Sequence, residues 1–212
     1  GNLVRLLVAE GDPVVSSLGG YPTFAYHVRG FGGVLHGAPY RDDAADPEAL
    51  ARLAAETGAG LVYLANPDNP MGGWRPGEEV LALVETLAPG AVLCLDEAYA
   101  DFAPEAALAE VDIDDPRVIR MRTFSKAYGL AGLRVGYALG EARLIAAFDR
   151  VRNHFGMGRI AQAGALAALA DRDWLALVVR EVARSRDRIA EIAAENGLVA
   201  LPSATNFVAV DC

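Results

Sequence analysis

Two short uninterrupted apolar runs constrain the fold of this chain more than any other feature. Leu61–Ala65 reads LVYLA and residues 91–95 read AVLCL, and turn-forming or polar residues flank both. Strands that are apolar on both faces are typical of a parallel sheet covered by helices on both sides. Between the two runs, residues 77–87 have the spacing of a helix. The sequence therefore predicts an α/β fold, in which a mostly parallel sheet is the middle of three α/β/α layers.

The same alternation extends over the first 140 residues. Asp46 and Pro47 are typical of an N-cap and a first helical position, so a helix is predicted from there to about Thr57. The other predicted strands are residues 14–17, 33–36, 118–122 and 135–139, and the other predicted helices are 3–9 and 22–28. In open sheets of this kind, ligands bind beyond the carboxyl ends of the strands.

After Gly140 the pattern becomes helical. Helices are predicted at residues 144–151 and 161–169, and a long one carries apolar residues at helical spacing from Leu175 to Ala193. Asn196 and Gly197 are typical of its C-terminal end, and a strand is predicted at 206–210.

Composition excludes several classes of partner. The formal net charge of −9 argues against nucleic acid or an anionic membrane as the main partner. No segment approaches the roughly 20 apolar residues of a transmembrane helix. The first residues lack a signal-peptide pattern, and Cys94 and Cys212 do not suggest a disulfide framework, so we expect a cytoplasmic protein.

Lys126 is the only lysine, against eighteen arginines. Arginine cannot lose its proton in a protein and so cannot form a Schiff base, whereas lysine can. Lys126 is therefore a candidate covalent anchor for a carbonyl compound or a cofactor aldehyde. The alternative is chance survival of one lysine in an arginine-biased composition.

Four of the predicted strands are followed by residues that could bind a ligand. Asp96, at the end of a buried strand, is costly unless it is paired, and a cationic ring nitrogen would pair it. Tyr99 could reach a neighbouring phenolic oxygen. Asn69 lies in the loop Asn66-Pro67-Asp68-Asn69-Pro70-Met71-Gly72, which offers amide donors. Each also has a simpler interpretation: Asp96 as a cap of the next segment, Tyr99 as a packed aromatic ring, and the loop of Asn69 as a plain turn.

The remaining strand ends suggest a phosphate and a planar ring. Thr123 and Ser125 flank Lys126 closely, and Arg134 follows eight residues after the lysine, so hydroxyls and a guanidinium could bind phosphate. Phe24 could stack on a heterocycle. The alternatives are a surface arginine and a core phenylalanine. Together, these groups fit one ligand with a phosphate, an aldehyde, a ring nitrogen and a phenolic oxygen, which is pyridoxal 5′-phosphate.

These motifs resemble those of fold-type I aminotransferases of class I/II, most closely the histidinol-phosphate aminotransferase branch. Residues 66–72 resemble the pattern N-P-x-N-P-T-G, with Met71 in place of threonine, and residues 96–99 resemble D-E-A-Y. Residues 125–137 are similar to S-K-x-x-G-L-A-G-L-R-x-G-Y. The motifs occur in the family order, with 27 residues from Asn69 to Asp96 and 30 from there to Lys126.

The resemblance implies transamination of an amino acid or amino-alcohol phosphate with a 2-oxo acid. Lys126 would hold the cofactor and move protons, with Asp96 on the ring nitrogen and Tyr99 with Asn69 on the phenolic oxygen. The implied phosphate and ring-stacking residues are Thr123, Ser125, Arg134 and Phe24. A pyridoxal-dependent decarboxylase or other lyase of the same fold is the alternative, and a non-catalytic binding role is a third.

The resemblance also implies an incomplete chain. Residues 1–155 would be the cofactor-binding large domain, lacking its N-terminal part. Residues 156–212 would be an interdomain helix and the start of a small α+β domain, without the arginine that usually binds the substrate carboxylate. We expect weak cofactor binding and little turnover from these 212 residues alone, and a homodimer when the protein is full length.

Other candidate sites are weaker. His27, His36 and His154 lack metal-ligand spacing, so no metal site is predicted. His154 is a candidate pocket residue, although a structural role is favoured. Residues 156–161 fit a relaxed dinucleotide fingerprint but follow no clear strand. Glu97 is predicted to be structural because lysine would do the proton transfer, and Cys94 is predicted to be a buried apolar filler.

Overall fold

The computed structural model describes all 212 residues. A six-stranded sheet has the order β2-β1-β3-β4-β5-β6, in which the first five strands are parallel and β6 is antiparallel to β5. The strands are β1 (Pro13–Ser17), β2 (Val34–Ala38), β3 (Leu61–Ala65), β4 (Val92–Asp96), β5 (Val118–Thr123) and β6 (Gly136–Gly140). The predicted mostly parallel α/β sheet is confirmed.

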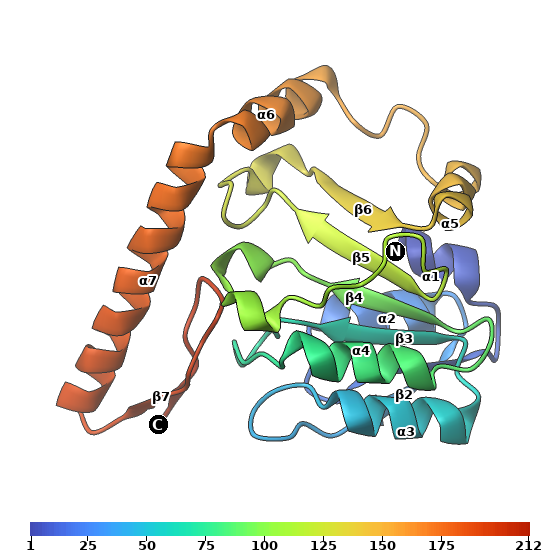
Figure 1. Cartoon of the computed structure of the whole chain (residues 1–212), viewed down its shortest axis with the longest axis horizontal. Helices are drawn as coiled ribbons and strands as arrows, with labels where there is room; N and C mark the ends of the chain where they lie inside the picture. Colours follow the sequence, from blue (N-terminus) through green and yellow to red (C-terminus); the bar gives the residue numbers. More distant parts are fainter.

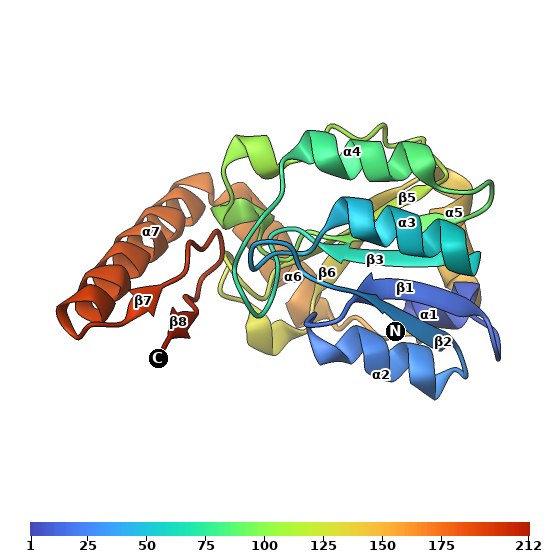
Figure 2. The same ribbon diagram turned by 90° about the horizontal axis from the view of Figure 1, so that it is seen from below.

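Helices cover both faces of this sheet. Helices α3 (Pro47–Thr57) and α4 (Gly77–Thr86) lie on one face, and α1 (Asn2–Leu7) and α2 (Pro22–Gly30) lie on the other (Figures 1 and 2). Alternate residues of β3 explain why: Val62 and Leu64 pack in the cluster beneath α3 and α4, while Leu61 and Tyr63 pack in the cluster beneath α1 and α2. The uninterrupted apolar runs are therefore needed because each strand has two buried faces.

Helix boundaries follow local signals. The Asp46 carboxylate accepts a hydrogen bond from the Glu48 N–H at 3.1 Å, which confirms the predicted N-cap of α3. Gly58 ends the same helix in the left-handed conformation, with φ +68°. Helix α5 (Ala142–Ala147) is shorter than predicted and passes into a 3₁₀ turn, η4 (Phe148–Arg150).

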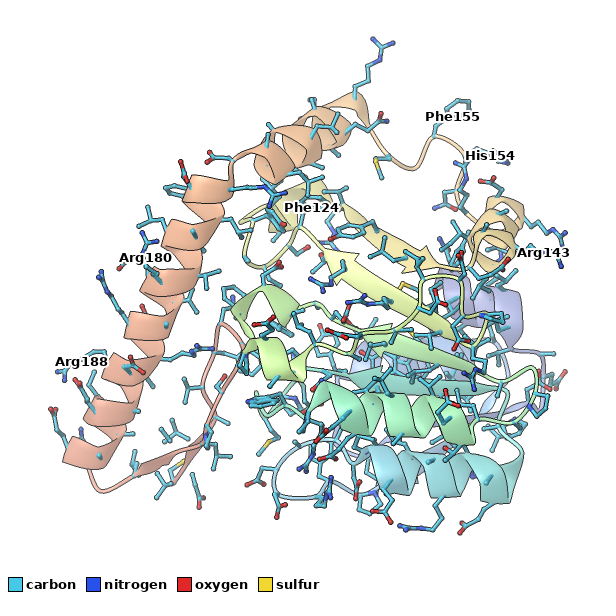
Figure 3. The ribbon with its side chains drawn as sticks, viewed as in Figure 1. Phe124, Arg143, His154, Phe155, Arg180 and Arg188 are labelled. Carbon is cyan, nitrogen blue, oxygen red and sulfur yellow. The ribbon has the colours of Figure 1, made fainter.

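The C-terminal part extends away from the sheet. Helix α6 (Arg159–Ala170) and the 24-residue helix α7 (Arg172–Glu195) form an arm along one side of the molecule, with Arg180 and Arg188 on its outer side (Figure 3). Phe124 packs between the end of β5 and α6. The predicted domain boundary after residue 155 falls in the connection before α6 and stays a prediction. None of the helices combines the length and apolar character needed to cross a membrane.

The predicted strand at 206–210 is wrong for all but its last residue. Strand β8 (Val210–Asp211) pairs antiparallel with β7 (Val199–Ala200), and the residues before it form a turn. The Ser203 and Thr205 hydroxyls donate to the Phe207 carbonyl at 2.6 and 3.1 Å, and the Thr205 hydroxyl accepts from the Phe207 N–H at 3.3 Å. Such local side-chain hydrogen bonds compete with strand pairing.

Candidate active site

A cavity of about 510 Å³ opens at the carboxyl ends of β3, β4 and β5. Parallel strands bring their carboxyl ends to one edge, so the loops that follow them meet there. Seven of the eight predicted site residues line this cavity: Asn69, Asp96, Tyr99, Thr123, Ser125, Lys126 and Arg134. Segments up to 65 positions apart in the chain therefore converge as the sequence predicted.

Lys126 lies on the turn after β5, with its amine in the cavity. Its Nζ is 4.9 Å from the centroid of the Tyr99 ring, close enough for a cation–π contact. The Asn69 side-chain amide donates to the Tyr99 hydroxyl at 2.9 Å. The lysine, the phenol and the amide thus form one contiguous group.

Asp96 ends β4 and points into the same cavity. It accepts hydrogen bonds from the Tyr63 hydroxyl at 2.6 Å and from the Ala98 N–H at 3.1 Å. Burial raises the pKa of the Asp96 carboxyl, and these two donors, together with the positive charge of Lys126, oppose that shift. A cationic partner in the cavity would lower the pKa of Asp96 further and so favour its carboxylate form.

Two hydroxyls and the Arg134 guanidinium also line this cavity. The Thr123 hydroxyl accepts from the Ser125 N–H at 3.0 Å, which fixes the turn that presents both hydroxyls. Arg134 adopts φ +52° and donates to the Ala131 carbonyl at 2.8 Å. The cavity lining thus includes two hydroxyls and a guanidinium, a donor set suited to an anion such as phosphate.

Phe24 is the one predicted residue outside this cavity. Its ring stacks on Tyr63, with centroids 4.3 Å apart and an interplanar angle of 18°, and it lines an adjoining cavity that shares Asp96 and Tyr63. Tyr21, the N-cap residue of α2, lines both cavities. The stacking role of Phe24 on a ligand stays a prediction, because its ring lies against Tyr63.

The aminotransferase class I and II family model matches residues 1–211. The chain belongs to this family. Among relatives, it is 37% identical over 209 residues to histidinol-phosphate aminotransferase 2 of Ralstonia nicotianae, covering 97% of this chain and 56% of that protein. It is 33% identical over 208 residues to an aromatic amino acid aminotransferase of Mycobacteroides abscessus, covering 97% of this chain and 60% of that protein.

A solved aminotransferase structure superimposes closely. The histidinol-phosphate aminotransferase of Sinorhizobium meliloti, solved in complex with pyridoxal-5′-phosphate, has a TM-score of 0.97 and 58% identity. The match covers all of this chain and 58% of that one. The present aminotransferase chain therefore spans a little over half the length of the relatives it matches.

Sequence reasoning missed two residues that line this cavity. Tyr63 donates to Asp96, and Arg122 lines the cavity beside the buried Glu97. Glu97 is 2% exposed and accepts from Arg120 at 2.8 and 2.9 Å and from Arg122 at 2.8 Å, in agreement with its predicted structural role. The one available signal for Tyr63 was a hydroxyl within an otherwise apolar strand.

The weaker candidates lie elsewhere. His154 is on the exposed connection before α6 and lines neither cavity (Figure 3). His36 is in β2, and His27 lines the adjoining cavity. Cys94 is 5% exposed among apolar residues, which confirms it as a buried filler, and burial raises the pKa of its thiol.

Proposed function

We propose that this chain binds pyridoxal 5′-phosphate and belongs to an enzyme that transfers an amino group to a 2-oxo acid. The amino donor would be an amino acid or an amino-alcohol phosphate of the histidinol-phosphate type. One observation carries the proposal: the amine of Lys126 shares a cavity with the Asp96 carboxylate and the hydrogen-bonded pair of Asn69 and Tyr99.

The donor set of the cavity fits the chemistry of this cofactor. Lys126 offers an amine for the aldehyde, and the half-buried Asp96 offers a carboxylate for a protonated ring nitrogen. Tyr99 and Asn69 offer an O–H and an N–H for the phenolic oxygen. Thr123, Ser125 and Arg134 offer two hydroxyls and a guanidinium for the phosphate.

When bound, the cofactor ring takes up the electrons left on the substrate α-carbon. Asp96 would hold a proton at the ring nitrogen, because a buried carboxylate is stabilised by an adjacent cation. Lys126 would hold the cofactor covalently through Nζ. As a free amine, the same Nζ would serve as the base and acid that moves the proton at the substrate α-carbon.

Other features of the full-length protein are part of the proposal. Two relatives are named for histidinol phosphate and for aromatic amino acids, which supports a small-molecule amino donor of one of these classes. We propose a homodimer, as the family resemblance implies, with neither nucleic acid nor membrane as partner. The acidic net charge of −9 supports the exclusion of nucleic acid and membrane as partners. The free thiols of Cys94 and Cys212 support a cytoplasmic location.

Amine transfer tests the proposal directly. The full-length protein, loaded with pyridoxal 5′-phosphate, is incubated with glutamate and a 2-oxo acid, or with histidinol phosphate and 2-oxoglutarate, and the products are separated by mass. We expect transfer of the amino group, and its loss in Lys126→Arg, which keeps the charge but cannot form a Schiff base. Release of carbon dioxide without amine transfer would contradict the proposal and indicate a decarboxylase.

A further inference from the structure

A turn that follows α7 in the chain contacts Tyr99 and the loop that carries Asn69, the two residues whose side chains share a hydrogen bond. The Ala204 N–H donates to the carbonyl of Gly72, in the loop that carries Asn69, at 2.8 Å. The Phe207 ring stands edge-on to the Tyr99 ring, with centroids 5.4 Å apart and an interplanar angle of 90°. The turn at 203–207 thus contacts the amide loop at one end and the phenol ring at the other.

Gly72 allows this turn to approach the amide loop. Its φ is +82°, and a Cβ built there would lie 2.5 Å from the Ser203 Oγ. A side chain at this position would be strained by the backbone conformation and would also push the turn away. The close approach therefore depends on glycine for two separate reasons.

The turn itself is rigidly built. Its two hydroxyls converge on the Phe207 carbonyl, and Thr205 is completely buried. Arg186 of α7 donates to the Thr205 carbonyl at 3.0 Å, which fixes the turn to the long helix. With its backbone held in this way, Phe207 lies with its ring against Tyr99.

We propose that the 203–207 turn is a positioning element, in which Phe207 and Gly72 act through Tyr99 and Asn69. This inference rests on the proposed function, in which the phenol and the amide donate to the phenolic oxygen of the cofactor. Donors at an oxygen favour its deprotonated form. The turn would therefore set both the affinity for the cofactor and the pH at which the bound chromophore changes its visible absorption.

The test uses the full-length protein and two matched pairs of variants. Phe207→Leu removes the ring contact and Gly72→Ala displaces the turn. Two control variants make the same substitutions away from the turn. Phe31→Leu replaces an exposed phenylalanine, and Gly58→Ala replaces a glycine that also has a positive φ, +68°, but whose added Cβ would have no atom within 4 Å. We measure the dissociation constant of pyridoxal 5′-phosphate by fluorescence quenching of the apoprotein, and the pH midpoint of the visible absorption change.

The two site variants are expected to weaken cofactor binding by about five-fold, which corresponds to one ordinary hydrogen bond, and to raise the pH midpoint. The two controls should match the wild type in both measurements. A purely structural role would lower thermal stability without moving the midpoint. Ser203→Ala, which removes the hydroxyl that holds the Phe207 carbonyl, provides a milder variant if Gly72→Ala does not fold.

The results separate this inference from the proposed function. If the wild type shows no visible band that borohydride abolishes, the proposed function fails and the inference fails with it. If the wild type has that band but Phe207→Leu and Ser203→Ala titrate as the wild type does, only the inference is overturned.

Discussion

The buried carboxylate of Glu97 allows a quantitative prediction that separates a structural from a chemical role. Glu97→Gln keeps the volume of the side chain but removes its charge. The wild-type carboxylate accepts three hydrogen bonds between 2.8 and 2.9 Å from Arg120 and Arg122. Their side chains are only 22% and 17% exposed, so water replaces the lost partner poorly. Breaking one side of such a network costs about 3–5 kcal/mol.

That cost is a large part of the roughly 5–15 kcal/mol that stabilises an ordinary domain. For a chain of this size it corresponds to a fall in Tm of roughly 6–20 °C. Urea unfolding of the apoprotein, followed by circular dichroism, measures the change as a lower midpoint with an unchanged slope. Glu85→Gln is the control, because the Glu85 carboxylate pairs with Arg117 but is 73% exposed, and we expect no resolvable change.

Two results would refute this reasoning about Glu97. One is a Glu97→Gln protein with wild-type stability, which would mean that the network contributes nothing. The other is a protein that keeps its stability and binds the cofactor but has lost amine transfer, which would give Glu97 a role in the chemistry. The structural account predicts the reverse, namely reduced stability with the covalent cofactor adduct retained.

Two further predictions concern single hydrogen bonds. Tyr63→Phe removes the donor to Asp96 and so raises the pKa of that carboxyl further. Cofactor affinity needs the carboxylate form, so it is lost as the pH falls through this pKa. The variant should therefore lose its affinity at a higher pH than the wild type. Affinity measured against pH checks this, and coincident wild-type and variant curves would exclude it. Asp46→Ala removes the N-cap of α3 and should lower the free energy of unfolding by about 1 kcal/mol in urea. The exposed Asp187→Ala serves as its control, and equal losses in both variants would show that the cap contributes nothing.

The sheet was predictable from sequence where burial imposes a simple pattern. Leu61–Ala65 is apolar throughout because both of its faces are covered, and the predicted range matches β3. The last predicted strand failed because the hydroxyls of Ser203 and Thr205 satisfy the Phe207 backbone locally, a competition that apolar periodicity does not register.

Part of the candidate site was predictable because the order and direction of the strands place it. Asp96 ends β4, and Lys126 lies on the turn after the neighbouring parallel strand β5. Topology alone therefore places both residues at one edge of the sheet. Tyr63 and Arg122 depend on strand register instead. Tyr63 lies opposite Cys94 in the ladder, which places its ring on the same face as Asp96 two residues on. Register of this kind is fixed by pairing and is not visible in one strand alone.

The covalent attachment of pyridoxal 5′-phosphate to Lys126 is the central claim, and one measurement tests it most directly. The full-length protein is loaded with the cofactor, reduced with borohydride and digested, and its peptides are mapped by mass. We predict that the peptide containing Lys126 carries the reduced cofactor and that Lys126→Arg abolishes this label. Labelling confined to other amines, with the Lys126 peptide unmodified, would contradict the account.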